Sequence, residues 1–435
     1  MTILEIITLL ILLAATFTYI NIKFLKLPAT IGMMVMALTM SSGIDLIGFF
    51  VPEVALGAKK ILSDFDFSDV LLNIMLSFLL FAGALHINLA KLAEEKWPII
   101  TLATAGVLIS TLITGTLTFY ALPLLGFDVP YIYCLLFGAL ISPTDPIAVL
   151  AMIKEYKVSK NLEVKFSGES LFNDGIGVVV FLTILEISNA GLDNFEFSGA
   201  MILFGQEVIG GILLGISLGF CGFHFLKAID NSQVQLEVLV TLTMVLTGTT
   251  IAQMVHVSAP LAMVVMGLFV GNEGRKLSIA NVAGDYVLKF WDLVDEALNA
   301  VLFILIGLQM VVIPFKFNHL LAAIMAIAIV LTSRFMGVGI PLKLMRLRRD
   351  IQSKTIRLLT WGGLRGGISV ALALSLPEFA YKDLLVAITY CVVVFSIIIQ
   401  GMTIGNMFQK VSKETQLNQK AVNGEKVKES VLTEA

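Results

Sequence analysis

Long apolar runs recur along this chain of 435 residues, and they restrict its fold more than any other feature. Many of them approach 20 residues, about the length of a helix that crosses the hydrocarbon core of a bilayer. Only 14% of the residues are charged and 57% are hydrophobic, whereas ordinary soluble domains carry about 25% charged residues. The sequence therefore predicts an all-α polytopic membrane protein.

We expect about thirteen spans, near residues 3–20, 28–50, 69–88, 98–122, 131–153, 165–189, 202–228, 235–254, 258–272, 294–314, 318–342, 356–376 and 383–408. The ninth is short enough to be partly re-entrant. The first lacks a basic leader and a small-residue cleavage site, so we expect it to be retained. Residues 410–435 are polar and predict a flexible tail after a transmembrane domain at 1–409.

The placement of lysine and arginine supports an odd number of spans. With the N-terminus outside, 23 of these residues fall in inside segments, four fall outside, and two lie within spans. Inside segments of membrane proteins carry such an excess of basic residues. We therefore expect a multi-pass protein of the cell (inner or plasma) membrane, with its N-terminus outside and its C-terminus in the cytoplasm.

Two of the spans are interrupted, the fifth by "SPTDP" and the twelfth by "WGGLRGG". If residues 202–228 are a connector, the flanking regions, about 1–190 and 235–409, form two inverted six-helix repeats. Each repeat then has its break in its fifth helix. Paired broken helices in inverted repeats are typical of the binding site of a secondary transporter.

The break in the fifth span, "LISPTDPIAVL", combines two prolines with Asp145. Proline removes an amide donor and ends a helix, and Asp145 before Pro146 fits an N-cap that starts the helix again. The break frees carbonyl groups, including that of Thr144, which suit a hard cation such as Na⁺ if they face a cavity. A proline kink used only for packing is the alternative.

The sixth span carries four polar residues in "SGESLFNDGIGVVVF". Ser170 and Asp174 are four residues apart, as are Glu169 and Asn173, so each pair shares one helix face. Asp174 with Ser170 makes an oxygen-only site with one negative charge, whereas Asn173 can donate a hydrogen bond to Glu169. An ordinary helix start, with an acid at its positive end, is the alternative for Glu169.

Two arginines lie within spans, and each needs a carboxylate or a set of helix-end carbonyls. Arg334 lies well inside its span, and we predict that it pairs with Glu169. Arg365 lies among the glycines of the second break, where the carbonyls at a half-helix end would bind a cation. The alternative for Arg365 is a position at the cytoplasmic interface.

Several other classes of function are disfavoured. No nucleotide-binding signature is present, and His86, His224, His256 and His319 lie near span ends without metal-ligand spacing, so we expect no cofactor and no enzyme activity. An intramembrane hydrolase using Ser170 would need a base that the sequence does not place nearby. A cation channel remains as a further alternative, and no nucleic-acid partner is expected.

The motifs "SPTDP", "GESLFND" and "WGGLRGG", in this order and spacing, resemble the NhaP-type sodium/proton antiporters, relatives of the animal sodium/proton exchangers. The resemblance covers residues 70–400. It implies a homodimer of thirteen-helix protomers, each with a core domain that contains crossed broken helices and a separate dimer-forming domain. It also implies exchange of Na⁺ or Li⁺ for H⁺.

The resemblance assigns roles to residues of this chain. Asp174 resembles the carboxylate that binds Na⁺ and H⁺ alternately, with Ser170 and the Thr144 carbonyl as neighbouring ligands and Asp145 close by. Asn173 occupies the first position of an Asn-Asp pair, and Glu169 resembles an acid that pairs with an arginine of the eleventh span.

One departure concerns the third span, where many relatives have a glutamate and this chain has Ala82 in "LLFAGALHINL". In some relatives that acid helps to coordinate the ion. A K⁺/H⁺ or mixed monovalent cation/proton antiporter is therefore the main alternative to Na⁺ exchange.

Competition for one carboxylate is sufficient to couple the two ion fluxes, because a site already neutralised by Na⁺ does not bind a proton favourably. A bare charge in mid-membrane costs at least about 2.5–3.5 kcal/mol, so neutral loaded states suit a moving domain. With Glu169 neutralised by Arg334, we expect electroneutral 1:1 exchange at Asp174.

Overall fold

The computed structural model describes residues 3–63, 67–156, 158, 160–190, 197–228, 233–278, 282–313, 316–346 and 353–411. Within these ranges the chain is helical, and the only strand-like pairing is an isolated bridge between Asp145 and Leu364. The predicted all-α class is confirmed. The predicted flexible tail lies almost wholly outside the described residues, from residue 412 onward.

The α-helices are α1 Ile3–Ile20, α2 Ala29–Phe50, α3 Pro52–Ser63, α4 Phe67–Asp69, α5 Leu76–Leu85, α6 Leu89–Glu94, α7 Lys96–Thr101, α8 Val107–Ala121, α9 Tyr131–Ile141, α10 Ile147–Glu155, α11 Lys160–Ala190, α12 Phe197–Ala228, α13 Val234–Met254, α14 Ala259–Ser278, α15 Val282–Leu308, α16 Phe317–Arg346, α17 Ser353–Trp361, α18 Gly367–Leu374 and α19 Lys382–Phe395. Short π-helical segments extend or join some of them, at Asn21–Leu25, Val70–Met75, Leu102–Gly106 and Ser396–Gln400.

Ten helices of the described part of the chain are long and apolar enough to cross a membrane. They correspond to ten of the thirteen predicted spans. The other three predicted spans correspond to α14, whose apolar part is short, and to the two pairs of half-helices α9–α10 and α17–α18. The total of thirteen membrane crossings stays a prediction.

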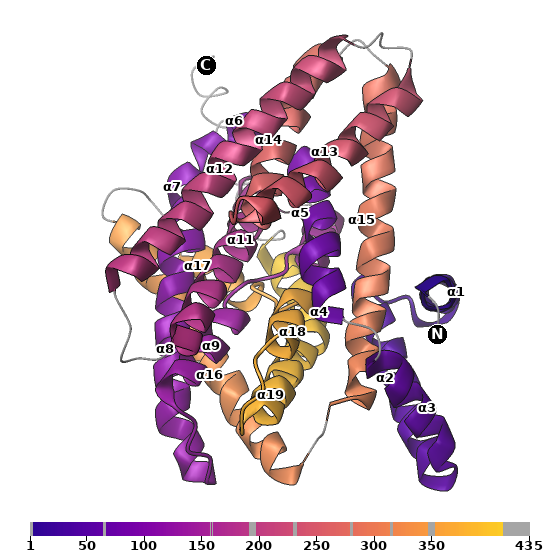
Figure 1. Cartoon of the computed structure of the whole chain (residues 1–435), viewed down its shortest axis with the longest axis vertical. Coiled ribbons are helices and arrows are strands. Elements are labelled where there is room, and N and C mark those ends of the chain that lie inside the picture. The colour runs from indigo at the N-terminus through magenta and orange to yellow at the C-terminus, as the bar shows by residue number, and fades with distance from the viewer. Residues whose placement is uncertain are drawn as a thin grey trace, which may run out of the picture.

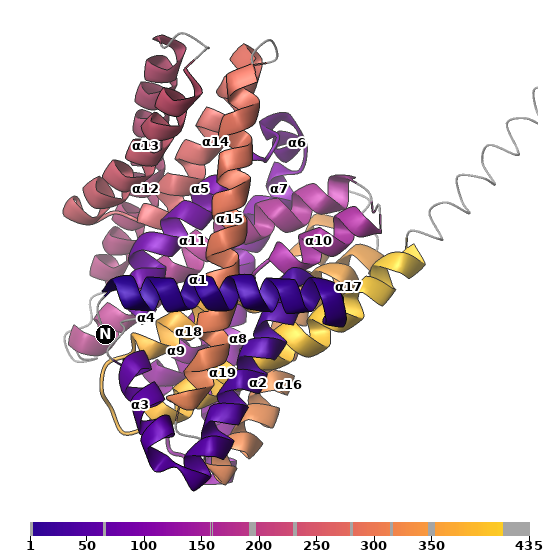
Figure 2. The ribbon, with the colours of Figure 1, turned by 90° about the vertical axis from the view of Figure 1, so that its right-hand side faces the viewer.

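The long helices pack side by side around α11, which lies in the middle of the molecule (Figure 1). The closest packing joins α12 to α14, α8 to α9, α5 to α14 and α2 to α15. Helix α1 is the exception, because it runs across α15 instead of along it (Figure 2). The half-helices α9, α10, α17 and α18 thus end beside α11, inside the helical assembly.

The tenth predicted span begins too late in the sequence. Helix α15 begins at Val282, twelve residues before the predicted start at 294. Asp285, Lys289 and Asp292 interrupt the apolar pattern in this part of the sequence, so apolar length alone predicts a start after them. The structure shows that these acids belong to one continuous helix.

A second apolar cluster lies apart from the main core, between α5, α13, α14 and α15. It includes Phe81, Ala82 and Trp291, and the indole Nε1 of Trp291 donates a hydrogen bond to the Thr241 hydroxyl at 3.0 Å. Ala82 is therefore packed among apolar side chains, and it brings no oxygen to its surroundings.

Candidate ion-binding site

Two helices are interrupted in the interior of the protein, both at the predicted motifs. The first break separates α9 from α10 and contains Pro143 and Pro146, which remove two amide donors. The second separates α17 from α18 and runs through residues 362–366, where glycine is frequent. Each break exposes carbonyl and amide groups that a continuous helix would pair internally.

The two breaks lie against each other. The amide of Asp145 donates a hydrogen bond to the Leu364 carbonyl at 2.8 Å. A Cβ atom built on Gly366 would lie only 2.6 Å from an oxygen of the Asp145 carboxylate, so glycine is needed for this close approach. The crossing of the two broken helices, implied by the family resemblance, is present.

Arg365 is 3% exposed and reaches from the second break to the first. Its Nη1 donates hydrogen bonds to the carbonyls of Ser142 and Pro143 at the end of α9, the second at 2.9 Å. The alternative position at the membrane interface is wrong. The carbonyls that Arg365 binds belong to the other break, which the sequence alone did not indicate.

The four polar residues of the sixth span lie in the interior of α11. Glu169, Ser170 and Asn173 are at most 2% exposed, and Asp174 is 7% exposed. The helix begins at Lys160, nine residues before Glu169. The alternative that Glu169 marks an ordinary helix start is therefore wrong, because the positive end of the helix is about 13 Å away at 1.5 Å per residue.

Thr144 is the point where α11 meets the first break. The Ser170 hydroxyl donates a hydrogen bond to the Thr144 carbonyl. The amide of Thr144 donates to Asn173 Oδ1 at 3.2 Å, and Asn173 Nδ2 lies 2.8 Å from the Thr144 hydroxyl. Asn173 Nδ2 also donates to Glu169 Oε1 at 2.9 Å. Asn173 therefore connects Glu169 with the break, instead of supporting Glu169 alone.

Asp174 is buried, but its Oδ1 has no hydrogen-bond partner. It lies within electrostatic range of the carboxylates of Asp145 and Glu169. A buried carboxylate oxygen without a donor is costly, and it is the atom of this site that is available to a proton or a cation. Ser170 lies one helical turn before Asp174 and contacts the Thr144 carbonyl, so further oxygen atoms that suit a hard cation lie on the same face of α11.

Asp145 caps the start of α10, and that start lies one residue later than the sequence predicts. The helix after the break begins at Ile147, one residue later than predicted, and Asp145 Oδ1 accepts a hydrogen bond from the Ile147 amide at 2.9 Å. Its other oxygen is not used by this cap, and the residue is partly exposed. Asp145 can therefore face a solvated ion while it holds the start of α10.

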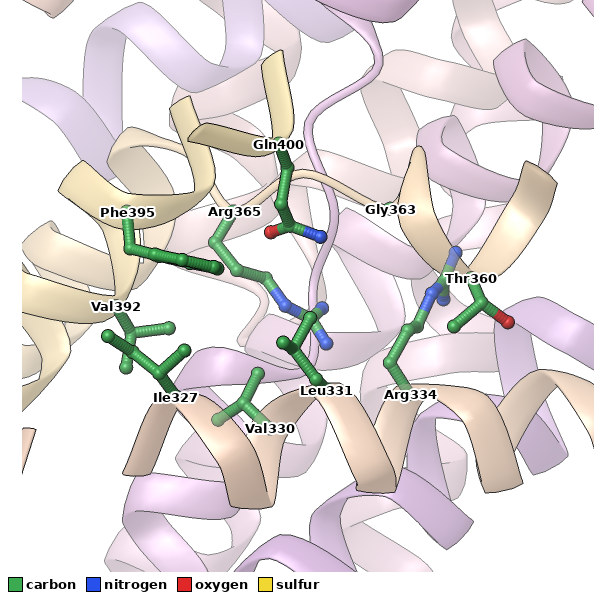
Figure 3. A pocket seen from close by; sticks show the side chains of 10 residues that line it. All are labelled: Ile327, Val330, Leu331, Arg334, Thr360, Gly363, Arg365, Val392, Phe395 and Gln400. Atoms are coloured by element: carbon green, nitrogen blue, oxygen red, sulfur yellow. The ribbon is translucent and has the colours of Figure 1, made fainter. Parts of the chain in front are cut away.

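Glu169 and Arg334, which the sequence analysis paired, are in contact. Arg334 Nη1 and Nη2 donate to the two oxygens of Glu169 at 2.7 and 2.9 Å, and Nη2 also lies 3.3 Å from the Leu359 carbonyl. Figure 3 shows Arg334 rising from α16 toward Thr360, with Arg365 nearby. The cavity that the two arginines border is about 10 Å³, room for one water molecule at most.

A much larger cavity of about 660 Å³ lies near Asp174. Its wall includes Val178 and Val179 of α11, four and five residues after Asp174, so its floor lies about one helical turn from that carboxylate. Glu207 of α12 and Leu372 of α18 line it from different sides. Asp174 itself is not part of the lining.

Two residues that the sequence analysis did not consider lie near Asp145. Asp295 of α15 is within electrostatic range of Asp145 and shares a hydrogen bond with Asn299. The signal that could have found them is the helical spacing of the acids that precede Asn299 in the sequence.

None of the described histidines has a recorded contact with Asp174, although His256 lines the large cavity. His86 forms an ion pair with Asp292 at 3.0 Å, whereas His319 is 5% exposed and packs against Phe127. Within the described ranges, no group of three histidine, cysteine or acidic side chains is arranged to hold a metal ion.

Comparison with known sequences gives one consistent result. The family described as "Sodium/hydrogen exchanger, transmembrane" matches residues 9–410. The chain is 47% identical over 415 residues to the Na⁺/H⁺ antiporter NhaP of Pseudomonas aeruginosa, covering 94% of this chain and 97% of that protein. It is 32% identical to the Na⁺/H⁺ antiporter NhaH of Halobacillus dabanensis, covering 93% and 97%.

A solved structure has a similar fold. The sodium proton antiporter MjNhaP1 from Methanocaldococcus jannaschii, determined at pH 8, superposes with a TM-score of 0.73 at 20% sequence identity. The match covers 94% of this chain and 98% of that chain. At this identity the likeness shows a common fold.

Proposed function

The chain belongs to the sodium/hydrogen exchanger family, and from this premise we propose that it exchanges Na⁺ for H⁺ at Asp174. The observation that carries the proposal is the unpartnered Oδ1 of the buried Asp174, on the same face of α11 as Ser170, whose hydroxyl contacts the Thr144 carbonyl. The relatives at 47% and 32% identity are both Na⁺/H⁺ antiporters, which supports the choice of ions.

The proposed coupling is competition for one negative charge. Around the two breaks and α11, three carboxylates (Glu169, Asp174 and Asp145) face two guanidinium groups (Arg334 and Arg365). One net negative charge remains, so one Na⁺ or one proton neutralises the group. A second ion would leave an excess of positive charge in a low-dielectric interior. Electroneutral 1:1 exchange is the stoichiometry that this balance favours.

The residues have distinct proposed roles. Asp174 binds Na⁺ or H⁺, and Ser170 with the Thr144 oxygens completes the Na⁺ site beside it. Asp145 contributes charge from the first break, while Glu169, Asn173, Arg334 and Arg365 hold the breaks in place. The Ser170 hydroxyl already donates to the Thr144 carbonyl, a contact that a hydrolytic nucleophile in need of a base would not use.

The proposed domain organisation follows the sequence analysis. Inverted repeats at about 1–190 and 235–409 would each supply one broken helix, and α12 would connect them. The large cavity is lined by residues of α11, α12 and α18. A cavity lined jointly by the connector helix and by helices of both repeats is expected where one part of a transporter moves relative to another. With the N-terminus outside, this cavity would open to the exterior. We also propose that the protein is a homodimer in the cell membrane and that its C-terminus lies in the cytoplasm.

The proposal is tested with the purified full-length protein in proteoliposomes. An imposed Na⁺ gradient should drive proton flux, and Asp174→Asn should abolish it while the protein still purifies as a folded species. Titration with Na⁺, Li⁺ and K⁺ at several pH values separates Na⁺ exchange from the K⁺/H⁺ alternative. Robust exchange by Asp174→Asn would refute the site, and currents far above carrier turnover would favour a channel.

A further inference from the structure

A line of acidic residues runs along one face of α15 toward Asn299. Asp285, Asp292 and Asp295 are spaced by seven and three residues, which places them on the same side of the helix. Asp285 and Asp292 are exposed, whereas Asp295 is partly buried. From Asp285 to Asp295 the helix rises about 15 Å, so Asp295 lies deeper in the protein than the other two acids.

The same face of α15 ends beneath the crossing of the two breaks. Asp295, Asn299 and Leu302 follow the spacing of a single helix face, and the side chain of Leu302 packs where a Cβ atom on Gly367 would lie. Gly367 begins α18 and follows Gly366, which lies against the Asp145 carboxylate. Asp295 and Asp145 also interact electrostatically. The acidic face of α15 therefore leads to Asp145.

Asn299 provides a second and independent indication of a ligand at this place. It is 4% exposed, and its side chain donates a hydrogen bond to the Asp295 carboxylate. Its own Oδ1 is buried and has no hydrogen-bond partner. A buried acceptor without a donor costs free energy. A carboxylate and an amide oxygen one turn apart form a pair of ligands that a hard monovalent cation would satisfy.

We propose that Asp295 and Asn299 form a second cation-binding position, which holds a partly hydrated Na⁺ beside Asp145 before the ion reaches Asp174. This inference rests on the proposed exchange function. Asp285 and Asp292 lie earlier on this face, with Lys289 between them and His86 Nε2 3.0 Å from Asp292 Oδ1, so the proposed position rests on Asp295 and Asn299. Because α15 begins at the side assigned to the cytoplasm, the second position serves ions that arrive from that side.

The test is the Na⁺ dependence of exchange, measured separately for the two sides of the membrane in oriented proteoliposomes. Asp295→Asn should raise the KM for Na⁺ on the α15 side by about five- to tenfold and change kcat by less than about twofold, since the central site is intact. Asp295→Glu should restore the wild-type KM. The matched control is Glu296→Gln, which removes the same charge from the adjacent, exposed position and should leave KM unchanged.

A binding measurement separates this inference from the proposed function. In purified Asp174→Asn protein, radioactive Na⁺ should still bind at millimolar concentrations, and addition of Asp295→Asn should abolish that binding. Complete loss of Na⁺ binding in Asp174→Asn alone, or an unchanged KM in Asp295→Asn, would overturn the second position. Failure of the wild-type protein to exchange ions would instead refute the proposed function, and the binding result would still report on Asp295.

Discussion

The guanidinium of Arg334 and the carboxylate of Glu169 form two parallel hydrogen bonds, with both residues at most 5% exposed. The same guanidinium contacts the Leu359 carbonyl near the end of α17. One ion pair therefore joins α11, α16 and α17, the helices that hold the candidate site and the second break.

Breaking this pair from one side should destabilise the protein strongly. Arg334→Met leaves the Glu169 charge buried and unpaired, which typically costs about 3–5 kcal/mol. Adding Glu169→Gln to Arg334→Met should recover part of the loss, because no unpaired charge then remains. Thermal unfolding of the detergent-solubilised single and double variants measures the difference.

The matched control for this cycle is the exposed pair between Lys382 and Glu378, which also has a separation of 2.7 Å. Glu378→Gln should change the free energy of unfolding by less than about 1 kcal/mol, since the Glu378 side chain is 88% exposed and an ion pair with a solvated partner contributes little. Strictly additive effects of Arg334→Met and Glu169→Gln would contradict the role of the buried pair.

Close packing of the two breaks should make Gly366 intolerant of a side chain. A Cβ atom there would lie 2.6 Å from Asp145 Oδ2 and 2.7 Å from Asp145 Cβ, so Gly366→Ala must displace Asp145. We expect the exchange rate to fall at least about tenfold, as small displacements of positioning groups do. Gly339→Ala on α16 is the control, because the nearest atom to its added Cβ is 4.0 Å away. Equal exchange rates in the two variants would argue against the importance of this contact.

Competition at Asp174 predicts a specific pH dependence. When protons occupy Asp174, each unit of pH decrease should raise the apparent KM for Na⁺ by about tenfold, because one proton must leave for one Na⁺ to bind. The maximal rate at saturating Na⁺ should change much less, since Na⁺ displaces the proton. Initial rates of proton flux over a matrix of pH values and Na⁺ concentrations measure both quantities. A falling maximal rate at constant KM would indicate a separate inhibitory protonation.

The charge balance around Asp174 predicts transport that does not respond to voltage. A cycle that moves net charge would change by about 2.3 kcal/mol per elementary charge for each 100 mV. Valinomycin and K⁺ gradients can set the potential of proteoliposomes while Na⁺-driven proton flux is measured at fixed pH. Equal rates at both signs of the potential are expected, and a clear difference would exclude 1:1 exchange.

Much of the candidate site could be predicted because charge is rare in apolar helices. Arg334 stands out as a single charge in a long apolar run, and its contact with Glu169 follows from the cost of leaving a buried charge unpaired. The breaks were predictable for a local reason, the prolines and glycines in the sequence. These signals depend on a few neighbouring residues only.

Other features depend on how distant segments meet. Arg365 binds carbonyls of Ser142 and Pro143, more than 200 positions earlier in the sequence, and no local pattern indicates that contact. The start of α15 was missed because its acids interrupt the apolar pattern used to find spans. Asn299 could not be singled out, because only the three-dimensional structure shows that its buried Oδ1 has no hydrogen-bond donor.

Arg365 also has a consequence for the water carried by a transported ion. Its guanidinium occupies the carbonyls of Ser142 and Pro143 as a tethered, permanent cation, which leaves Thr144 as the nearest carbonyl for a mobile one. So few protein oxygens cannot replace the whole hydration shell of Na⁺. An ion at Asp174 would therefore keep some of its own water molecules, and the protein would discriminate between Na⁺, Li⁺ and K⁺ mainly by how readily each gives up the rest.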